Sequence, residues 1–154
     1  MKLTIVCAGK IKEAWLADAI REYKKRLQKY CALDIIEVQD SPDTLPRDVA
    51  LDKEGKAMLS KIKAGAYVFV SDLHGKECSS EEWSEKLIRG FEKGGSEVVI
   101  VIGGSWGLSP ELIARADERI CLSQMTFTHQ MTRLILLEQS YRGFKIHNNE
   151  KYHK

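Results

Sequence analysis

The sequence predicts an α/β fold with a mostly parallel sheet and helices on both faces. Short apolar runs alternate with longer amphipathic segments along the 154 residues, and this alternation is typical of such folds. The run from Val98 to Ile102 is continuous and β-branched in character, which indicates a strand buried on both faces. The glycine-rich segment 103–107 follows directly, at the edge where open α/β sheets bind ligands. The length fits a single domain over 1–154.

The first half of the chain is expected to contain two strands, two helices and a loop. Apolar residues dominate 2–8 and 33–38, and each run is short enough to be a strand. Between them, residues 13–28 repeat apolar side chains at the i, i+3 and i+4 spacing of an amphipathic helix. The segment 40–46 holds two of the three prolines and is a loop, and a second helix follows over about 47–62.

A third strand and a well-marked helix come next. The strand covers 66–70 and ends in a polar segment. Ser79 and Glu82 have the spacing of a capping box, which marks the start of a helix. The glycine pair 94–95 indicates where that helix stops.

The last third of the chain begins with the buried strand, over 97–102. Ser109 followed by Pro110 is typical of a helix start, because serine caps free amides and proline suits the first helical position. A short strand is expected at 119–122, and a long helix over about 129–146 completes the fold.

The composition indicates a soluble globular protein without a metal site. Hydrophobic residues make up 44% and charged residues 30%, with a net charge of +2. No stretch approaches the roughly 20 apolar residues that a membrane span needs, and the first residues are too strand-like for a signal peptide. We therefore expect a cytoplasmic protein. The cysteines are far apart and form no C-x-x-C pair, so we expect free thiols at Cys7, Cys31, Cys78 and Cys121.

The positive charge is concentrated at the C-terminal end. Residues 129–154 contain five Lys/Arg against two acids, giving +3, whereas residues 1–128 contain 19 against 20, giving −1. A basic end on a near-neutral body indicates an anionic partner, with nucleic acid first. A solvated helix face is the alternative. The bases are Arg133, Arg142, Lys145, Lys151 and Lys154.

The glycine motif matches neither of two common phosphate-binding patterns. It reads G-G-x-x-G, so it is not G-x-G-x-x-G, and no Gly-Lys-Ser/Thr follows. A tight structural turn is the alternative to a ligand loop. The segments 71–75 and 122–127 end neighbouring strands and would form a pocket with it, suited to a planar heterocycle such as adenosine. For Met125 and Phe127 taken singly, core packing is the simpler interpretation.

The C-terminal end is dense in functional side chains. Glu138 and Arg142 are four residues apart on the long helix and form a pair on one face, which by itself indicates only a surface ion pair. The terminal segment 148–154 would ordinarily be a frayed end.

In combination, these motifs resemble the ribosomal large-subunit methyltransferase H family of SPOUT-class enzymes, over the whole chain. The resemblance rests on Ile102 to Gly104 with Gly107, Leu122 to Gln130, Glu138 to Arg142, and Tyr152-His153-Lys154. It implies a deep trefoil knot in the C-terminal part and a homodimer whose sites are completed by the partner subunit. It also implies S-adenosylmethionine as cofactor and methylation of N3 of a pseudouridine in a 23S rRNA stem-loop, on assembled ribosomes.

The resemblance assigns roles residue by residue. It implies a catalytic or substrate-orienting role for Glu138, Arg142, Tyr152 and His153. RNA binding is expected at Arg133, Lys145, Lys151 and Lys154, and also at Arg142. The cofactor-binding residues it implies are Ser71, Asp72, Leu73, Gly103, Gly104, Leu122, Ser123, Gln124, Met125, Thr126 and Phe127.

The chemistry suggests how the C-terminal residues act. The imino proton on N3 must leave, and we expect His153, or Glu138 through water, to accept it. Arg142 would stabilise developing negative charge or hold a phosphate.

The long helix carries more apolar surface than a short sheet needs, so we expect part of it at a dimer interface. The residues expected there are Leu134, Ile135, Leu137 and Tyr141. The alternatives are a SPOUT enzyme acting on another RNA position and a non-catalytic ribosome-binding or assembly factor.

Overall fold

The computed structural model describes residues 1–154 and contains one five-stranded sheet in which every neighbouring pair of strands is parallel. The spatial order is β2-β1-β4-β3-β5. Five helices alternate with the strands, which confirms the predicted α/β class. The strands are β1 (Lys2–Ala8), β2 (Ala32–Val38), β3 (Tyr67–Lys76), β4 (Glu97–Ile102) and β5 (Glu118–Ile120). The helices are α1 (Ala14–Leu27), α2 (Arg47–Leu59), α3 (Ser80–Lys93), α4 (Pro110–Arg115) and α5 (His129–His147).

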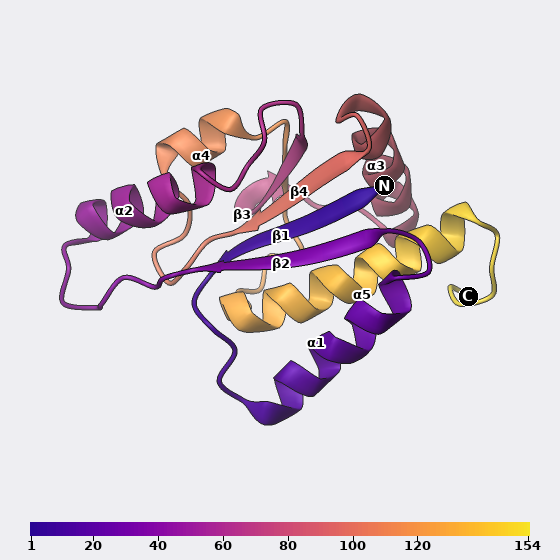
Figure 1. The fold of residues 1–154 in the computed structure, drawn as a ribbon, viewed down its shortest axis with the longest axis horizontal. Helices are drawn as coiled ribbons and strands as arrows, with labels where there is room; N and C mark the ends of the chain where they lie inside the picture. Colours follow the sequence, from indigo (N-terminus) through magenta and orange to yellow (C-terminus); the bar gives the residue numbers. More distant parts are fainter.

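Helices cover both faces of the sheet, as predicted (Figure 1). On one face α1, α3 and α5 enclose a large apolar core around Ile5, Phe69 and Ile100. On the other face α2 and α4 enclose a smaller core around Val70 and Val101. The central strand β4 is almost entirely buried because both helix layers cover it, which is why its sequence is a continuous apolar run.

The predicted helix starts are present as capped ends. The side chain of Ser79 accepts a hydrogen bond from the backbone N–H of Glu82, and the Glu82 carboxylate accepts one from the N–H of Ser79. Ser109 caps α4, with Pro110 in the first turn. Thr128 caps α5 by accepting from the N–H of Met131. These caps fix the direction in which each helix leaves its preceding loop.

Strand β3 is longer than the sequence predicts. It continues beyond Val70 to Lys76, and its pairing with β5 is interrupted by a bulge between Ser71 and Lys76. A Cβ on Gly75 would lie 2.7 Å from the backbone carbonyl carbon of Ile120, so only glycine allows this approach. The segment expected as a free loop is therefore attached to the sheet edge. The trefoil knot implied by the resemblance stays a prediction.

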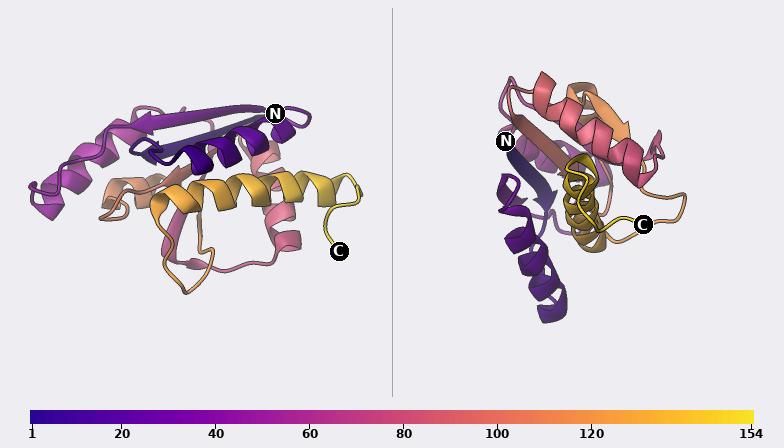
Figure 2. Two further views of the ribbon diagram at one scale, coloured as in Figure 1. Left: turned by 90° about the horizontal axis from the view of Figure 1, so that it is seen from below. Right: turned by 90° about the vertical axis from the view of Figure 1, so that its right-hand side faces the viewer.

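Helix α5 connects the two regions of functional interest. Its 19 residues run along one face of the sheet, packed against α1 and α3. Figure 2 shows its first turn beside the 121–128 segment and the C-terminus at its far end. No helix in the structure is both long enough and apolar enough to cross a membrane.

Candidate active site

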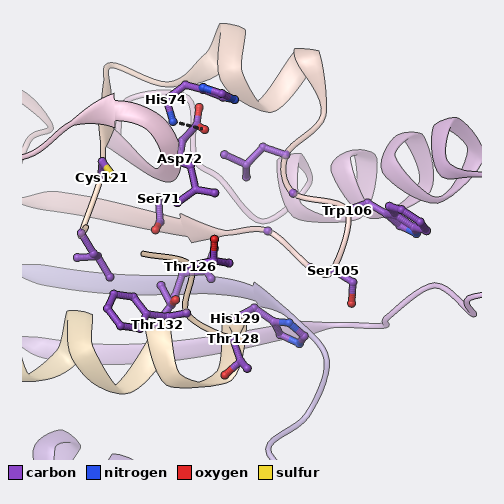
Figure 3. Close-up of a pocket in the computed structure, with 18 of the residues that line it drawn as sticks. Ser71, Asp72, His74, Ser105, Trp106, Cys121, Thr126, Thr128, His129 and Thr132 are labelled. Carbon is purple, nitrogen blue, oxygen red and sulfur yellow. Dashed lines mark hydrogen bonds between the residues drawn. The ribbon is translucent and has the colours of Figure 1, made fainter. Parts of the chain in front are cut away.

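A cavity of about 870 Å³ lies beyond the carboxyl ends of the central strands (Figure 3). Three segments, which follow or end β3, β4 and β5, contribute most of its lining. The predicted pocket is therefore present, with one exception among its expected members: Gln124 does not line it. The expected residues that do line it are Ser71, Asp72, Leu73, Gly103, Gly104, Leu122, Ser123, Met125, Thr126 and Phe127.

The glycine segment forms a closed, tight loop at the edge of this cavity. The N–H of Gly107 donates to the carbonyl of Gly104 at 3.0 Å. A Cβ on Gly103 would lie 2.3 Å from the Gly107 carbonyl oxygen, and Gly107 has a φ of +88°. Side chains are thus excluded at Gly103, and Gly107 has a conformation that favours glycine. The segment is therefore a tight turn, and it also lines the cavity.

Asp72 ties the β3 segment to the neighbouring strand. Its carboxylate accepts from the backbone N–H of His74 at 3.0 Å and from Nε of Arg119 at 2.8 Å. Burial alone would raise the pKa of Asp72, but these hydrogen bonds outweigh it and lower the pKa. Asp72 is therefore ionised and paired, and it holds the lining segment in place.

The cavity combines an apolar rim with one buried polar atom that lacks a hydrogen-bond partner. Leu73, Trp106, Met125 and Phe127 are large apolar residues that line the cavity and are exposed, Met125 at 72%. On the floor, Nε2 of His129 is buried and has no hydrogen-bond partner. An apolar wall with a few open polar positions is typical of a site for a heterocyclic ligand. Figure 3 shows His129, Thr128 and Thr132 together at the start of α5.

The predicted catalytic residues form a second cluster, between the middle of α5 and the C-terminus. The carboxylate oxygen Oε1 of Glu138 accepts from Nη2 of Arg142 at 2.7 Å and from the hydroxyl of Tyr152 at 3.0 Å. The guanidinium of Arg142 also stacks over the Tyr152 ring at 4.7 Å. Its hydrogen bond to Glu138 raises the pKa of Arg142. Burial, with hydrogen bonding to Tyr23 and Glu138, raises the pKa of Tyr152.

His153 has a partner on each ring nitrogen. Nδ1 lies 3.3 Å from Nη1 of Arg142, and Nε2 lies 2.7 Å from Oε1 of Glu81 on α3. Arginine has no acceptor, so Nδ1 accepts and Nε2 donates when the imidazole is neutral. The Glu81 side chain is 57% exposed, so solvent weakens this contact. In the neutral imidazole the lone pair of Nδ1 is therefore taken up by the contact with Arg142.

The two clusters do not meet within one chain. Thr132 lines the cavity, and Arg142 lies ten residues further along α5. At a rise of 1.5 Å per residue, this places them about 15 Å apart along the helix axis. The C-terminal segment folds against α3 and α5 at that far end (Figure 1). The structure thus places the cofactor-binding candidates and the catalytic candidates in two separate clusters.

The expectation that Arg133 binds RNA is wrong. Arg133 is 0% exposed, and its Nη2 donates to the carbonyls of Ala8 and Gly9 at 3.3 and 3.1 Å. Its guanidinium faces the end of β1 and not solvent, because position 133 lies on the sheet-facing side of α5. A sequence count of charges cannot distinguish the two faces of a helix. Arg133 is a structural residue.

The other predicted RNA-binding residues are placed differently from one another. Nζ of Lys145 lies 2.6 Å from a carboxylate oxygen of Glu150, with only 16% of the lysine side chain exposed. Its charge is therefore neutralised locally. Lys151 and Lys154 are exposed and form no ion pair.

The apolar residues expected at a dimer interface also differ in how far they are buried within the chain. Leu137 is buried inside the chain, and Tyr141 packs edge-on against the Tyr152 ring at 5.0 Å. Leu134 and Ile135 are half-buried. Only part of this set is therefore available to another molecule.

Some lining residues were not found from the sequence. Arg47 begins α2, far from the motifs in sequence, and no local pattern connects it to the cavity. Trp106 lies inside the glycine motif, so an aromatic residue between the glycines was the signal that the sequence offered. In the structure its side chain is exposed. His74 lies in the β3 segment, beside the residues that were chosen.

The chain matches known proteins over its whole length. A family model described as "Predicted SPOUT methyltransferase" matches residues 1–153. Proteins named ribosomal RNA large subunit methyltransferase H, from Clostridioides difficile and Acetivibrio thermocellus, are 49% and 48% identical over 159 residues, covering all of both chains.

Solved structures of methyltransferases share the fold at low identity. A probable methyltransferase from Bordetella pertussis aligns with a TM-score of 0.59 and 13% identity, covering 92% of this chain and 95% of its own. A probable methylase family protein from Haemophilus influenzae aligns with a TM-score of 0.55 and 15% identity, covering 99% and 70%. With the family match and the full-length relatives, this shows that the chain belongs to the SPOUT methyltransferase family.

Proposed function

We propose that this protein transfers a methyl group from S-adenosylmethionine to N3 of a pseudouridine in 23S rRNA. The observation that carries the proposal is the cavity, in which the three predicted segments converge beside a closed glycine loop. The names of the full-length relatives, which specify large-subunit ribosomal RNA, support the substrate class. We place the reaction in the cytoplasm, on assembled ribosomes, in line with the family resemblance.

The cavity fits S-adenosylmethionine in size and chemistry. An adenine ring suits the apolar side chains of Leu122 and Phe127, which line the cavity. A ligand can also approach the backbone at Gly103 closely, because glycine has no side chain there. The buried Nε2 of His129 lacks a partner and would accept or donate a hydrogen bond to the ligand. We also propose that the segments at 71–76 and 121–128 belong to a trefoil knot.

We further propose that the active enzyme is a homodimer with composite sites. None of the cluster residues lines the cavity of its own chain, and along α5 Glu138 and Arg142 lie about 9 and 15 Å from Thr132. A partner subunit that delivers its own cluster to this cavity removes the separation. The exposed rim at Leu73, Trp106 and Met125 provides apolar surface for such a contact.

The C-terminal cluster supplies the groups that N3 methylation needs. With S-adenosylmethionine bound, its sulfonium supplies an electrophilic methyl group. His153 accepts the N3 proton at Nδ1 when the substrate replaces Arg142 there, or Glu138 accepts it through water. Arg142, held by Glu138 and Tyr152, presents a fixed positive charge to a carbonyl oxygen of the base or to a phosphate.

Two measurements test this proposal. Isothermal titration should show S-adenosylmethionine binding to the purified protein, and its absence would leave a ribosome-binding factor as the function. Mass spectrometry of 23S rRNA nucleosides from a deletion strain should show loss of N3-methylpseudouridine, restored by the gene. A methyl group lost from a different nucleoside would reassign the substrate position and contradict the proposal.

A further inference from the structure

The carboxyl end of α1 is a second basic region, separate in sequence from the C-terminal tail. Lys24, Lys25 and Arg26 lie in its last turn, and Lys29 follows just beyond it. All four side chains are exposed, and the first turn of the helix has no acidic residue. The net charge of residues 1–128 does not reveal this basic region, because basic and acidic residues nearly cancel over that part of the chain.

The fold places this region directly beside the tail. The hydroxyl of Tyr30 lies 3.0 Å from both carboxylate oxygens of Glu150, and Nζ of Lys29 lies 3.5 Å from one of them. The Arg26 guanidinium stacks over the Tyr141 ring, at 5.8 Å from its centre. In Figure 1 the carboxyl ends of α1 and α5 lie at the same end of the molecule.

Several lysines at this end of the molecule form no salt bridge. Lys24 and Lys25 form no ion pair, and neither do Lys151 and Lys154. By contrast, the bases that lie against the tyrosines are paired: Arg26 with Glu22, Lys29 and Lys145 with Glu150, and Arg142 with Glu138. We call Lys24, Lys25, Lys151 and Lys154 the α1–tail surface.

We propose that the α1–tail surface binds the phosphate backbone of the RNA next to the nucleotide that is methylated. This inference rests on the proposed function, since it takes RNA as the substrate. Ammonium groups that form no salt bridge attract phosphates, and phosphate binding releases counter-ions. Of the five predicted RNA-binding residues, Arg133 is buried and Arg142 and Lys145 are paired, so the tail alone offers few free charges. Lys24 and Lys25 supply the missing ones.

A purely local explanation accounts for less of the arrangement. Lysines in the last turn of a helix interact favourably with the partial negative charge at its carboxyl end. That interaction explains Lys24 and Lys25 individually, but it predicts nothing about Lys151 and Lys154. It also does not explain why the tail is fastened to this end of α1 through Glu150.

The test compares two double variants that each remove two positive charges. Lys24→Gln/Lys25→Gln changes the α1–tail surface. Lys53→Gln/Lys61→Gln is the matched control, because both lysines are exposed, have no ion pair and lie on or just after α2, on the opposite face of the sheet. The probe is a 23S rRNA stem-loop carrying pseudouridine, with binding measured from 0.05 to 0.3 M salt. S-adenosylmethionine affinity and thermal unfolding are measured in parallel.

For Lys24→Gln/Lys25→Gln we expect RNA affinity to fall about tenfold at 0.1 M salt and the salt slope to decrease by about 1.4–1.8, since each lost phosphate contact contributes about 0.7–0.9. KM for RNA rises while kcat, S-adenosylmethionine affinity and unfolding stay as in the wild type. The control variant keeps the wild-type slope.

Three results would overturn the inference. In the first, the two double variants weaken RNA binding equally, so only net charge matters. In the second, Lys24→Gln/Lys25→Gln keeps the wild-type slope. In the third, the variant binds the stem-loop normally but binds ribosomes weakly, which assigns the surface to a ribosomal protein. If the wild type itself fails to bind S-adenosylmethionine or to methylate RNA, the proposed function fails instead.

Discussion

The hydroxyl of Tyr30, just past the end of α1, lies 3.0 Å from both carboxylate oxygens of Glu150 in the C-terminal tail. Glu150 also accepts from Nζ of Lys145 at 2.6 Å, and the hydrogen bonds from Lys145 and Tyr30 lower the pKa of Glu150 to about 2. One carboxylate therefore fastens the tail to two helices. Tyr152 and His153 follow immediately, so their positions depend on it.

Replacing Glu150 should impair methyl transfer without impairing cofactor binding. Glu150→Gln removes the charge that holds Lys145, and the tail loses its fixed position. A displacement of about 1 Å at reacting groups costs up to about a hundredfold in rate, so we expect a single-turnover rate tenfold to a hundredfold lower. Tyr30→Phe, which removes only the hydroxyl, should have a smaller effect. Equal rates for the wild type and Glu150→Gln would show that the tail position does not depend on Glu150.

The glycine loop should tolerate no side chain at its first position. In Gly103→Ala the new Cβ would lie 2.3 Å from the Gly107 carbonyl oxygen, so the loop must open. We expect S-adenosylmethionine affinity to fall more than tenfold by isothermal titration. Gly65→Ala is the control, because a Cβ there has nothing within 4 Å. Unchanged affinity in Gly103→Ala would separate the loop from the cofactor site.

Replacing Arg133 should lower stability, whereas replacing Lys151 should weaken RNA binding, although both residues were predicted to bind RNA. Arg133→Ala leaves the carbonyls of Ala8 and Gly9 without their buried donor, and the free energy of unfolding should fall by about 3 kcal/mol. Lys151→Ala should leave unfolding unchanged and decrease the salt slope of RNA binding by about 0.7–0.9. Urea unfolding and a salt titration check both. A stable Arg133→Ala protein with a reduced slope would reverse our assignment.

Stability should decrease in acid partly through Glu118. Burial alone would raise the pKa of Glu118, but hydrogen bonds from Lys86, Arg89 and Tyr67 outweigh burial and lower the pKa to about 2. A lowered pKa stabilises the folded state at pH values above the ordinary value of 4.5, and the stabilisation is lost as pH falls from 4.5 towards 2.

We expect Glu118→Gln to be less stable than the wild type by about 1–2 kcal/mol at pH 7, after allowance for solvent screening. The difference should shrink between pH 4.5 and pH 3 in urea unfolding. A difference that is constant with pH would show that the carboxylate charge does not contribute.

His153 should determine how the rate depends on pH. An imidazole base is inactive when protonated, so the wild-type single-turnover rate should fall on the acid side. His153→Ala should be slower and lose this dependence. An unchanged rate with an unchanged profile would exclude His153 and leave Glu138, acting through water, as the base.

Much of the fold was predictable because local chemistry determines it. The β-branched run at Val98 to Ile102 is buried by helices on both faces, as its composition requires. The capping residues Ser79 and Ser109 start helices where expected, because their hydroxyls satisfy backbone N–H groups within the same few residues. The end of β3 was missed, since its extension to Lys76 depends on contact between Gly75 and β5, more than 40 residues away.

The sequence by itself determined the α/β class and, through short motifs, the segments that line most of the cavity and the residues of the C-terminal cluster. It wrongly included Gln124 in the cavity and missed Arg47 and Trp106. The tertiary structure decided how these parts relate. It turned Arg133 inward, paired Lys145 with Glu150, and kept the C-terminal cluster out of the cavity of its own chain, with Glu138 about 9 Å and Arg142 about 15 Å along α5 from Thr132. It also joined the end of α1 to the tail. Which side of a helix faces the sheet, and which distant segments become neighbours, depends on packing of the whole chain, and no local pattern contains that information.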